Sequence, residues 1–367
     1  MKLSIRPCLA LGLALSLTMT GIGAARTAVV HAAGPITNVG QLAQFTNCSS
    51  AGKPVNKNLT VAFAQADLNT PWRVTEQQNF TFWATKLCIP HFLTNQANES
   101  VSTQLSNVSD LLARKPTVLI LDPEATKPLV PAVDMAARAH IPLIVVDRAL
   151  SVKPGAATYQ LFIGANQFQE GYQSARWWVY KLKKTQHTTN PKANLAIIMG
   201  GVGQDPAIER NAGVYAAIKP YPRIKVVAVQ SGDWTRQGGR AVMQAYIERF
   251  PAGSVQGVFT ASDEMMIGAQ QALAAAHRTD INGWFFADDG QMQGIQAVVS
   301  GINVADTQNA PFYGQPSLEA AVAIAQGVTF HGTTLELVNK TFTCQTTTLC
   351  GQARSYLAQI QLAHQLF

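Results

Sequence analysis

Residues 117–149, "TVLILDPEATKPLVPAVDMAARAHIPLIVVDRA", contain the pattern that decides the fold. Two short apolar runs, "TVLILD" and "IPLIVVD", flank a longer amphipathic stretch at 127–139. Apolar runs of this kind are typical of strands buried on both faces, and an intervening helix is typical of a parallel connection. The segment therefore predicts a strand–helix–strand unit of a parallel sheet.

The same alternation continues along most of the chain. The other strand candidates are "LTVAFAQ", "PHFLT", "YQLFIG", "NLAIIMG", "IKVVAVQ", "VQGVFTA", "GWFFAD" and "INVADTQ". The other helical windows are 72–87, 104–114, 167–183, 208–218, 237–250 and 264–277. A polar segment, "KTQHTTNPKAN", interrupts the pattern after five strands, so we expect two Rossmann-like α/β lobes rather than one closed barrel. The leucine spacing of the C-terminal tail suggests an amphipathic helix, either docked or free.

The N-terminus has the layout of a secretory signal peptide. Lys2 and Arg6 precede the apolar run "CLALGLALSLTMTGIGA", and small residues suited to cleavage follow it. We expect residues 1–32 to be this signal, with an uncleaved anchor as the alternative. The 367 residues, 47% of them hydrophobic, suffice for two globular domains.

The charge balance argues against a nucleic-acid partner. Without Lys2, Arg6 and Arg26, the excess of basic over acidic residues falls from seven to four. The remaining basic residues are scattered, so they do not form the footprint that nucleic acid requires.

Outside residues 1–32, the cysteines are Cys48, Cys88, Cys344 and Cys350. An even number in an exported chain suggests disulfides, and the short spacing in "CQTTTLC" favours Cys344–Cys350 with Cys48–Cys88 among the three connectivities. A metal site is the competing interpretation, but the spacings match no zinc pattern. We expect neither a metal nor a cofactor.

Polar side chains follow the ends of most predicted strands. These residues are Trp72, Arg73, Asp122, Asp147, Arg148, Gln204, Asp205, Arg210, Asp233, Trp234, Arg236, Ser262, Asp263, Asp288, Asp289 and Gln308. In open α/β sheets, ligands bind beyond the carboxyl ends of the strands. Carboxylates, guanidinium groups, amides and indoles together suit a neutral polyhydroxylated ligand, since each hydroxyl both donates and accepts.

Each of these residues also has a purely structural interpretation. Aspartates after strands often cap helices or form turns, and Asp205 and Asp263 are most like caps or hinge-side turns. Trp72 and Trp234 could belong to the core. The coincidence of such residues at many strand ends, with Arg148 directly after an aspartate, favours a shared binding site.

Several motifs then fall in the order and spacing of a known family. The segments "VVDRA", "SDEMMIGA" and "DDG", with the pattern through Arg210, resemble the ribose-binding class of solute-binding proteins of sugar ABC importers, which have the type I periplasmic-binding-protein fold. The resemblance runs from about residue 59 to 337. The stretches "AQADLNTPWRVTEQQN" and "VQSGDWTRQGGRAVMQAYI" are most similar to the galactofuranose-binding subgroup.

The resemblance implies a set of ligand-binding residues. They are Trp72, Arg73, Asp147, Arg148, Arg210, Trp234, Asp289 and Gln308, with Trp234 as the stacking aromatic. At Asp122, relatives often have asparagine or an apolar residue, and at Ser262 asparagine is usual. Both are retained as ligand-binding candidates, and both bear on which sugar fits.

The resemblance also implies discontinuous lobes joined by a three-segment hinge. We expect an N-terminal extension at 33–54, an N-terminal lobe from 55–165 plus 309–332, and a C-terminal lobe from 166–308 plus 333–345. Residues 346–367 form the C-terminal tail. The implied protein is a monomer outside the cytoplasmic membrane.

The implied function is capture of a monosaccharide by hinge closure and delivery to an ABC permease, without covalent chemistry. One alternative is a sensor that presents the closed form to a receptor or kinase ectodomain. Another is a glycoside hydrolase that uses Asp122, Asp147 and Asp289, although neighbouring arginines would keep these acids ionised. A sugar-responsive repressor would need N-terminal DNA-binding helices where this chain carries an export signal.

Overall fold

The computed structural model describes residues 35–155, 157 and 159–362. The predicted signal peptide, residues 1–32, lies outside the described residues, as do positions 33 and 34 of the predicted N-terminal extension. The fold below belongs to the unit that begins at Ile36.

The elements alternate along the chain as the apolar pattern predicts. The strands are β1 (Thr60–Gln65), β2 (His91–Gln96), β3 (Val118–Leu121), β4 (Leu143–Val146), β5 (Tyr159–Ala165), β6 (Ala193–Met199), β7 (Ile224–Ser231), β8 (Gly257–Thr260), β9 (Phe285–Asp289), β10 (Asn303–Gln308), β11 (Thr333–Leu337) and β12 (Thr341–Thr343). The helices are the 3₁₀ helix η1 (Val39–Gln44), then α1 (Pro71–Lys86), α2 (Val101–Ala113), α3 (Pro131–Arg138), α4 (Gln167–Thr185), α5 (Asp205–Ile218), α6 (Arg236–Arg249), α7 (Asp263–Ala275), α8 (Met292–Ser300), α9 (Gly314–Ala325) and α10 (Thr347–Leu362).

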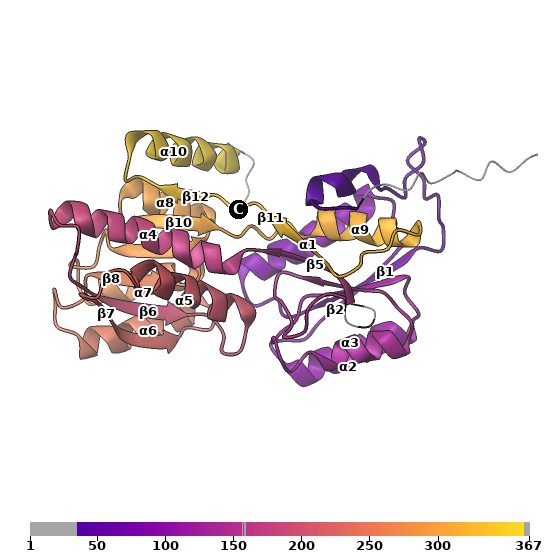
Figure 1. Ribbon diagram of the computed structural model, residues 1–367, viewed down its shortest axis with the longest axis horizontal. Helices are drawn as coiled ribbons and strands as arrows, with labels where there is room; N and C mark the ends of the chain where they lie inside the picture. The colour runs from indigo at the N-terminus through magenta and orange to yellow at the C-terminus, as the bar shows by residue number, and fades with distance from the viewer. Residues whose placement is uncertain (1–34, 156, 158, 363–367) are drawn as a thin grey trace, which may run out of the picture. The chain divides into compact units, whose positions relative to one another are not determined.

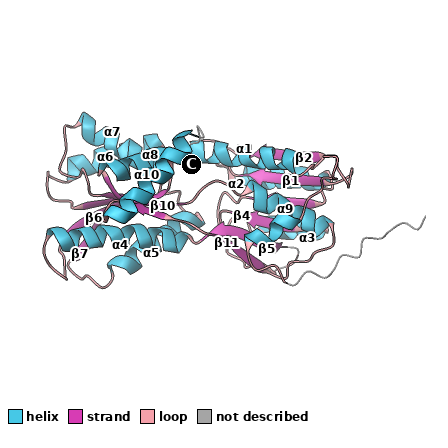
Figure 2. Ribbon diagram, turned by 90° about the horizontal axis from the view of Figure 1, so that it is seen from above, coloured by secondary structure: helices cyan, strands magenta, loops and turns pink. Residues whose placement is uncertain are grey.

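The strands form two six-stranded sheets (Figure 1). The first has the order β11-β5-β4-β3-β1-β2, and the second has the order β12-β10-β9-β8-β6-β7. Paired strands are parallel except β10 and β12, which are antiparallel. Figure 2 shows helices α6, α7 and α8 on one face of the second sheet and α4 and α5 on the other. The predicted fold of two α/β lobes is confirmed. Each sheet with its helices is called the first or the second lobe below.

The apolar character of the strands follows from their place in the sheets. Every residue of β3 and β4 is buried, because both strands are central and helices cover both faces. The edge strand β2 has no fully buried residue. Continuous apolar runs are therefore expected in the central strands of a sheet and not in its edge strands.

Several helices begin at strand exits with a side-chain cap. Thr70, Ser100, Asn166, Thr235 and Ser262 each accept a hydrogen bond from the amide three residues further on. Such caps satisfy amides that have no partner within the helix.

Of the two alternatives predicted for Asp205 and Asp263, a helix cap or a hinge-side turn, the capping role is wrong for both. Asp263 and Asp205 are the first residues of α7 and α5, not their caps. Ser262 caps α7 in place of Asp263, and Gln204 precedes α5 without a side-chain cap.

The chain passes between the lobes three times. The first passage follows β5 and the second follows β10. The third lies between β11 and β12, at residues 338–340. The expected boundary before residue 333 is therefore too early, because β11 pairs in parallel with β5 of the first sheet.

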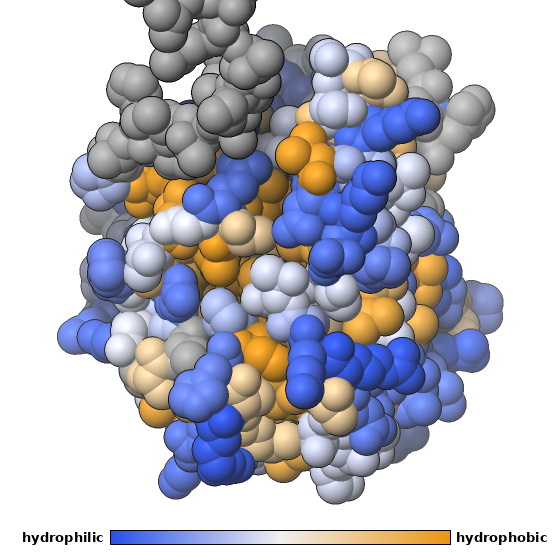
Figure 3. All heavy atoms as spheres, turned by 90° about the vertical axis from the view of Figure 1, so that its right-hand side faces the viewer, coloured by the Kyte–Doolittle hydropathy of each residue, from blue (hydrophilic) through white to orange (hydrophobic). Residues whose placement is uncertain are grey.

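The segment before β1 packs on the first lobe. Leu42 of η1 is fully buried in the same apolar cluster as Phe80 and Leu318, and the Cys48–Cys88 disulfide ties the segment to the end of α1. Figure 3 shows the end of the first lobe, where apolar side chains are interspersed among hydrophilic ones. The segment at 36–54 is thus part of the first lobe's core.

The C-terminal tail is helical and docked. Ala353 and Ile360 of α10 are buried in a cluster with Ile295 and Phe342 of the second lobe. The second predicted disulfide, Cys344–Cys350, links the start of this helix to the residue after β12, so both predicted pairings are present. No helix among the described residues is long and apolar enough to cross a membrane.

Helices α4 and α5 approach so closely that only glycine fits at two positions. A Cβ on Gly213 would meet the carbonyl oxygen of Phe168, and one on Gly171 would meet the carbonyl of Arg210. The contact places Arg210 of α5 beside Glu170 of α4.

Replacing Gly213 by alanine is therefore expected to lower the free energy of unfolding by about 1–3 kcal/mol, the usual range for overpacking. The matched control is Gly351→Ala, since a Cβ added there would have no other atom within 4 Å and α10 gains a better helix former. Urea denaturation of both variants checks this. Equal stability of the two would contradict the close-packing argument.

Candidate functional site

A pocket lies where strands of both sheets end and the chain passes between the lobes. It contains about 510 Å³ of empty space, part of it open to solvent. The lining residues are Asp67, Thr70, Trp72, Arg73, Glu99, Asp147, Arg148, Pro206, Arg210, Trp234, Ser262, Glu264, Asp289 and Asn309. Both lobes and the second passage thus contribute to one site.

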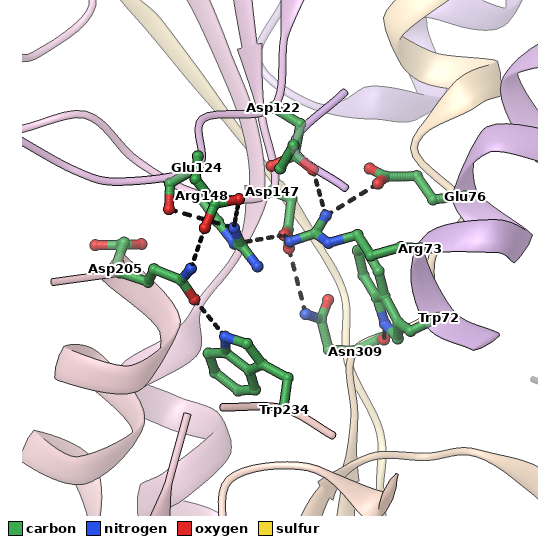
Figure 4. Close-up of polar contacts among 12 residues, drawn as sticks. Trp72, Arg73, Glu76, Asp122, Glu124, Asp147, Arg148, Asp205, Trp234 and Asn309 are labelled. Atoms are coloured by element: carbon green, nitrogen blue, oxygen red, sulfur yellow. Dashed lines mark hydrogen bonds and ion pairs between the residues drawn. The ribbon is translucent and has the colours of Figure 1, made fainter. Parts of the chain in front are cut away.

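The guanidinium of Arg73 is surrounded by buried carboxylates (Figure 4). Its Nη1 lies 3.0 Å from Glu76 Oε2 and also binds Asp122. Its Nη2 lies 2.9 Å from Asp147 Oδ2, and its Nε lies 3.8 Å from Asp67 Oδ2. Burial raises the pKa of Glu76 to about 7, and the attraction of Arg73 opposes that shift. Because one cation faces several acids, the cluster tends to hold protons near neutral pH.

Arg148 follows Asp147 at the exit of β4 and points toward Glu124 (Figure 4). Its Nη1 donates to Glu124 Oε2 at 3.4 Å. Its Nε lies 4.0 Å from Asp147 Oδ2 and has no hydrogen-bond partner among the described residues. The backbone of Asp147 is left-handed, with φ of 56°. That conformation is unfavourable for residues other than glycine and is concentrated at functional sites.

Arg210 has the corresponding role in the second lobe. Its Nε donates to Glu170 Oε2 at 2.7 Å, and its Nη2 lies 3.0 Å from Asp289 Oδ1. Burial raises the pKa of Asp289 to about 8 and that of Glu170 to about 7, against the opposing attraction of Arg210. Burial also raises the pKa of Asp122 well above its usual range. The expectation that neighbouring arginines keep the acids ionised is therefore wrong for Asp122 and Asp289. Asp289 also has a left-handed backbone, with φ of 119°.

Trp234 projects from a strained turn between β7 and α6. Asp233 and Trp234 have φ of 51° and 63°, two consecutive left-handed residues. The indole Nε1 donates to Gln204 Oε1, and the Arg210 guanidinium carbon lies 5.7 Å from the ring centroid. A Cβ on Gly200 would run into the ring. The indole is therefore fixed in the pocket by its turn, its hydrogen bond and the space left at Gly200.

Trp72 connects the first lobe to the passage after β10. Its Nε1 donates to the carbonyl oxygen of Asn309 at 2.7 Å. The Asn309 side chain lies 3.4 Å from Asp147 Oδ1 and accepts from the Tyr313 hydroxyl at 2.9 Å. Arg73 also stacks on the Trp72 ring, 4.5 Å from its centroid.

The structure brings most of the predicted site residues together. Those that line the pocket are Trp72, Arg73, Asp147, Arg148, Arg210, Trp234, Ser262 and Asp289. Asp122 and Gln308 are not among the lining residues. Asp122 is fully buried behind Arg73, and Gln308 donates to the Tyr356 hydroxyl of α10 at 2.6 Å.

Other lining residues were not predicted from the sequence. These are Asp67, Thr70, Glu99, Pro206, Glu264 and Asn309. Asp67 and Thr70 lie in the quoted segment "AQADLNTPWR", and Asn309 directly follows Gln308, so their position at strand exits could have identified them. Glu170, the partner of Arg210, lies inside a helix and carries no such signal.

The family model described as "Periplasmic binding protein domain" matches residues 61–329. The chain belongs to this family. It is 29% identical to the galactofuranose-binding protein YtfQ of Escherichia coli (strain K12), over 59% of this chain and 66% of that protein. It is 31% identical to a xylitol-binding protein of Mycolicibacterium smegmatis, over 64% of this chain and 62% of that protein. The match therefore spans just under two thirds of these relatives' length.

Solved structures of similar fold cover more of the chain. A protein from Mycobacterium smegmatis in complex with β-D-fucofuranose has a TM-score of 0.73 and 27% identity, over 84% of this chain and 97% of that one. A galactofuranose binding protein has a TM-score of 0.74 over 82% of this chain and 98% of that one; its 24% identity makes this a likeness of fold.

In this periplasmic-binding-protein chain, two acids support the turn that carries Asp289. Asp306 Oδ1 accepts from the Gly290 amide at 3.0 Å, and Asp263 Oδ2 accepts from the Gln291 amide at 2.7 Å. The other oxygens, Asp263 Oδ1 and Asp306 Oδ2, are buried without a partner among the described residues, and both lie over Gly294. Burial raises the pKa of Asp263 well above its usual range, and the charge of Asp306 adds to that shift. Burial also raises the pKa of Asp306, to about 6. The geometry fits two carboxyl groups that share a proton.

This pair makes stability depend on pH. An unfolded aspartate titrates near about pH 4, so the folded state binds more protons above that value and the free energy of unfolding falls as pH rises through about 6. Asp263→Asn supplies a permanent donor to Asp306. At about pH 8 we expect this variant to be more stable than wild type by roughly 1–2 kcal/mol, with the difference lost near about pH 4.

Urea denaturation across this pH range measures the effect. Asp280→Asn is the control, because hydrogen bonding with Arg278 lowers the pKa of Asp280 to about 2 and its neutralisation should reduce stability at neutral pH. An Asp263→Asn variant with the pH slope of wild type would show that the two acids do not share a proton.

Proposed function

We propose that this chain captures a neutral monosaccharide between its two lobes and delivers it to an ABC permease. The observation that carries the proposal is the set of groups that meet in one pocket: the indole of Trp234, the guanidinium groups of Arg148 and Arg210, and the carboxyl groups of Asp147 and Asp289. An indole face packs against the C–H side of a sugar ring, while the charged groups accept and donate to its hydroxyls.

Two buried donors lack hydrogen bonds among the described residues. They are Arg148 Nε and Arg210 Nη2, the latter near Asp289 but without hydrogen-bond geometry. A buried donor without an acceptor is unfavourable by about 1–3 kcal/mol. Ligand hydroxyl oxygens in the pocket would satisfy both, one from each lobe.

The relatives support the choice of a small sugar or polyol. Their names state galactofuranose, xylitol, D-apiose and ribose as ligands. The M. smegmatis structure at 27% identity contains β-D-fucofuranose. A binding protein from Shewanella sp. ANA-3, at 25% identity, contains L-arabinofuranose. We therefore propose a furanose form for this chain's ligand. Ser262, which departs from the family pattern, caps α7, and Asp122 supports Arg73 from behind, so their effect on specificity would be largely indirect.

The lobes would close on the ligand about the three passages. A sugar that bridges Asp147 and Arg148 of the first lobe with Arg210 and Trp234 of the second favours the closed form, because only that form offers both sets of contacts. The permease would then recognise the closed outer surface. Relatives named as import binding proteins favour a permease over a receptor as the partner.

We propose that the protein acts outside the cytoplasmic membrane as a monomer, without a cofactor, metal or nucleic acid. The two disulfides and the signal-like N-terminus support this location. No covalent step is proposed, since the family relatives are named as binding proteins and Asp147 is paired with Arg73. Turnover of aryl glycosides that depends on Asp147 would overturn this view.

The Trp234→Ala variant is expected to bind sugar about ten- to a hundredfold more weakly, because the ring loses its stacking platform. Phe82→Ala is the matched control, since Phe82 is 53% exposed on α1 and is not a pocket residue. Isothermal titration calorimetry against pentoses, hexoses and galactofuranose measures both, after mass spectrometry of any ligand that co-purifies.

Substitution of Asp147 and Arg148, the first-lobe residues proposed to bind the sugar hydroxyls, tests the position of the site. If Asp147→Ala and Arg148→Ala retained wild-type affinity for the best sugar, the proposed site would be wrong. Wild-type protein that binds no sugar in the panel and carries none on purification would refute the proposed function itself.

A further inference from the structure

Residues 201–205 of the second lobe, the loop before α5 and the first residue of that helix, touch the first lobe directly. The Thr126 amide donates to the Gly203 carbonyl at 3.2 Å, and the Ala149 amide donates to Asp205 Oδ2 at 3.3 Å. Gln204 Nε2 donates to Glu124 Oε1 at 2.7 Å. The third contact joins two side chains that are both buried, at 6% and 5% exposure.

The Gln204 contact is also connected to the pocket at both ends. Its Oε1 accepts from the indole Nε1 of Trp234. Glu124, on the other side, accepts from Arg148 through Oε2. A continuous path of hydrogen bonds therefore runs from Trp234 in the second lobe to Arg148 in the first lobe, with one amide at its centre.

The chemistry of this position suits an amide. The indole needs an acceptor, and the carboxylate of Glu124 needs a donor. A primary amide supplies both at once, whereas an ionised carboxylate only accepts and an apolar side chain does neither.

Two adjacent glycines leave room for this arrangement. A Cβ on Gly201 would collide with the side-chain amide of Gln204, and a Cβ on Gly200 would collide with the ring of Trp234. The "MGGVGQ" segment thus accommodates both partners of the hydrogen bond.

We propose that Gln204 is a positioning residue that couples the orientation of Trp234 to closure of the lobes through Glu124. The inference rests on the proposed function, because it concerns the same sugar site. Gln204 does not need to touch the sugar. When the first lobe is near, Glu124 fixes the Gln204 amide with its oxygen toward the indole, so the position of Trp234 and that of Arg148 are set together.

Gln204→Glu tests the coupling by a change of one group. At about pH 7.5 the new carboxylate faces Glu124, and sugar affinity should fall roughly ten- to a hundredfold because the pair loses its donor and gains repulsion. Burial raises the pKa of Glu124; the charges of Arg148 and Arg73 oppose this shift, and that of Asp67 adds to it. Asp205 is the residue next to the new acid in the chain. Near about pH 5 one of the two acids can bind a proton and donate, so most of the affinity should return.

The exchange variant Glu124→Gln/Gln204→Glu provides the sharper test. It keeps one amide–carboxylate hydrogen bond with its direction reversed, and the indole retains an acceptor. We expect it to bind sugar more tightly at about pH 7.5 than Gln204→Glu alone, by at least about fivefold. Gln244→Glu, the same change at an exposed position of the second lobe, should match wild type throughout.

Calorimetry gives the affinities, and small-angle scattering of the ligand-free variants reports lobe opening without any sugar. If Gln204→Glu bound sugar like wild type and left the scattering unchanged, the inference would fail while the proposed function stood. An exchange variant no better than Gln204→Glu, or a loss without pH recovery, would likewise overturn the coupling. If wild type bound no sugar, the proposed function would fail. In that case, unchanged scattering of Gln204→Glu would separately show that the Gln204–Glu124 contact does not affect lobe opening.

Discussion

The buried guanidinium of Arg73 is the interaction on which the rest of the pocket depends. Glu76, Asp122 and Asp147 converge on it from α1 and from the ends of β3 and β4. Several acids in a water-poor interior require a cation or protons, and removal of the cation would leave charges without compensation. Because Trp72 is the preceding residue and its indole holds the Asn309 carbonyl, the first turn of α1 fixes both the acid cluster and the second passage between the lobes.

In the second lobe, Arg210 likewise compensates a group of buried acids, since it forms ion pairs with Glu170, Asp288 and Asp289. Both lobes also place strained backbone at the strand exits, since Asp147, Asp289 and the Asp233–Trp234 turn have positive φ. Each such residue costs about 1–3 kcal/mol and persists only where the surroundings determine it. Here the surroundings are specific: Asp263 and Asp306 hold the turn after Asp289, and Gln204 holds Trp234.

Strands and helices were largely predictable because the central strands are apolar on both faces and the helices between them are amphipathic. The strands β11 and β12 escaped prediction, since "TTLEL" and "TFT" are short edge strands whose pairing depends on distant residues. Most lining residues follow from their place after strands. The partner of Arg210, Glu170, does not, because a helix position gives no hint of which arginine it meets. The contact of Gln308 with Tyr356 of α10 is likewise visible only in three dimensions.

The position of β11 near the C-terminal end of the sequence affects the order in which the chain can fold. This strand completes the first sheet beside β5, and α9 packs against α1, so the first lobe is assembled from both ends of the chain. Contacts between residues so distant in sequence form slowly, because a long loop must close before they are made. The second sheet likewise waits for β12. During synthesis neither lobe can be finished until the last strands leave the ribosome, and the growing chain stays accessible to chaperones throughout.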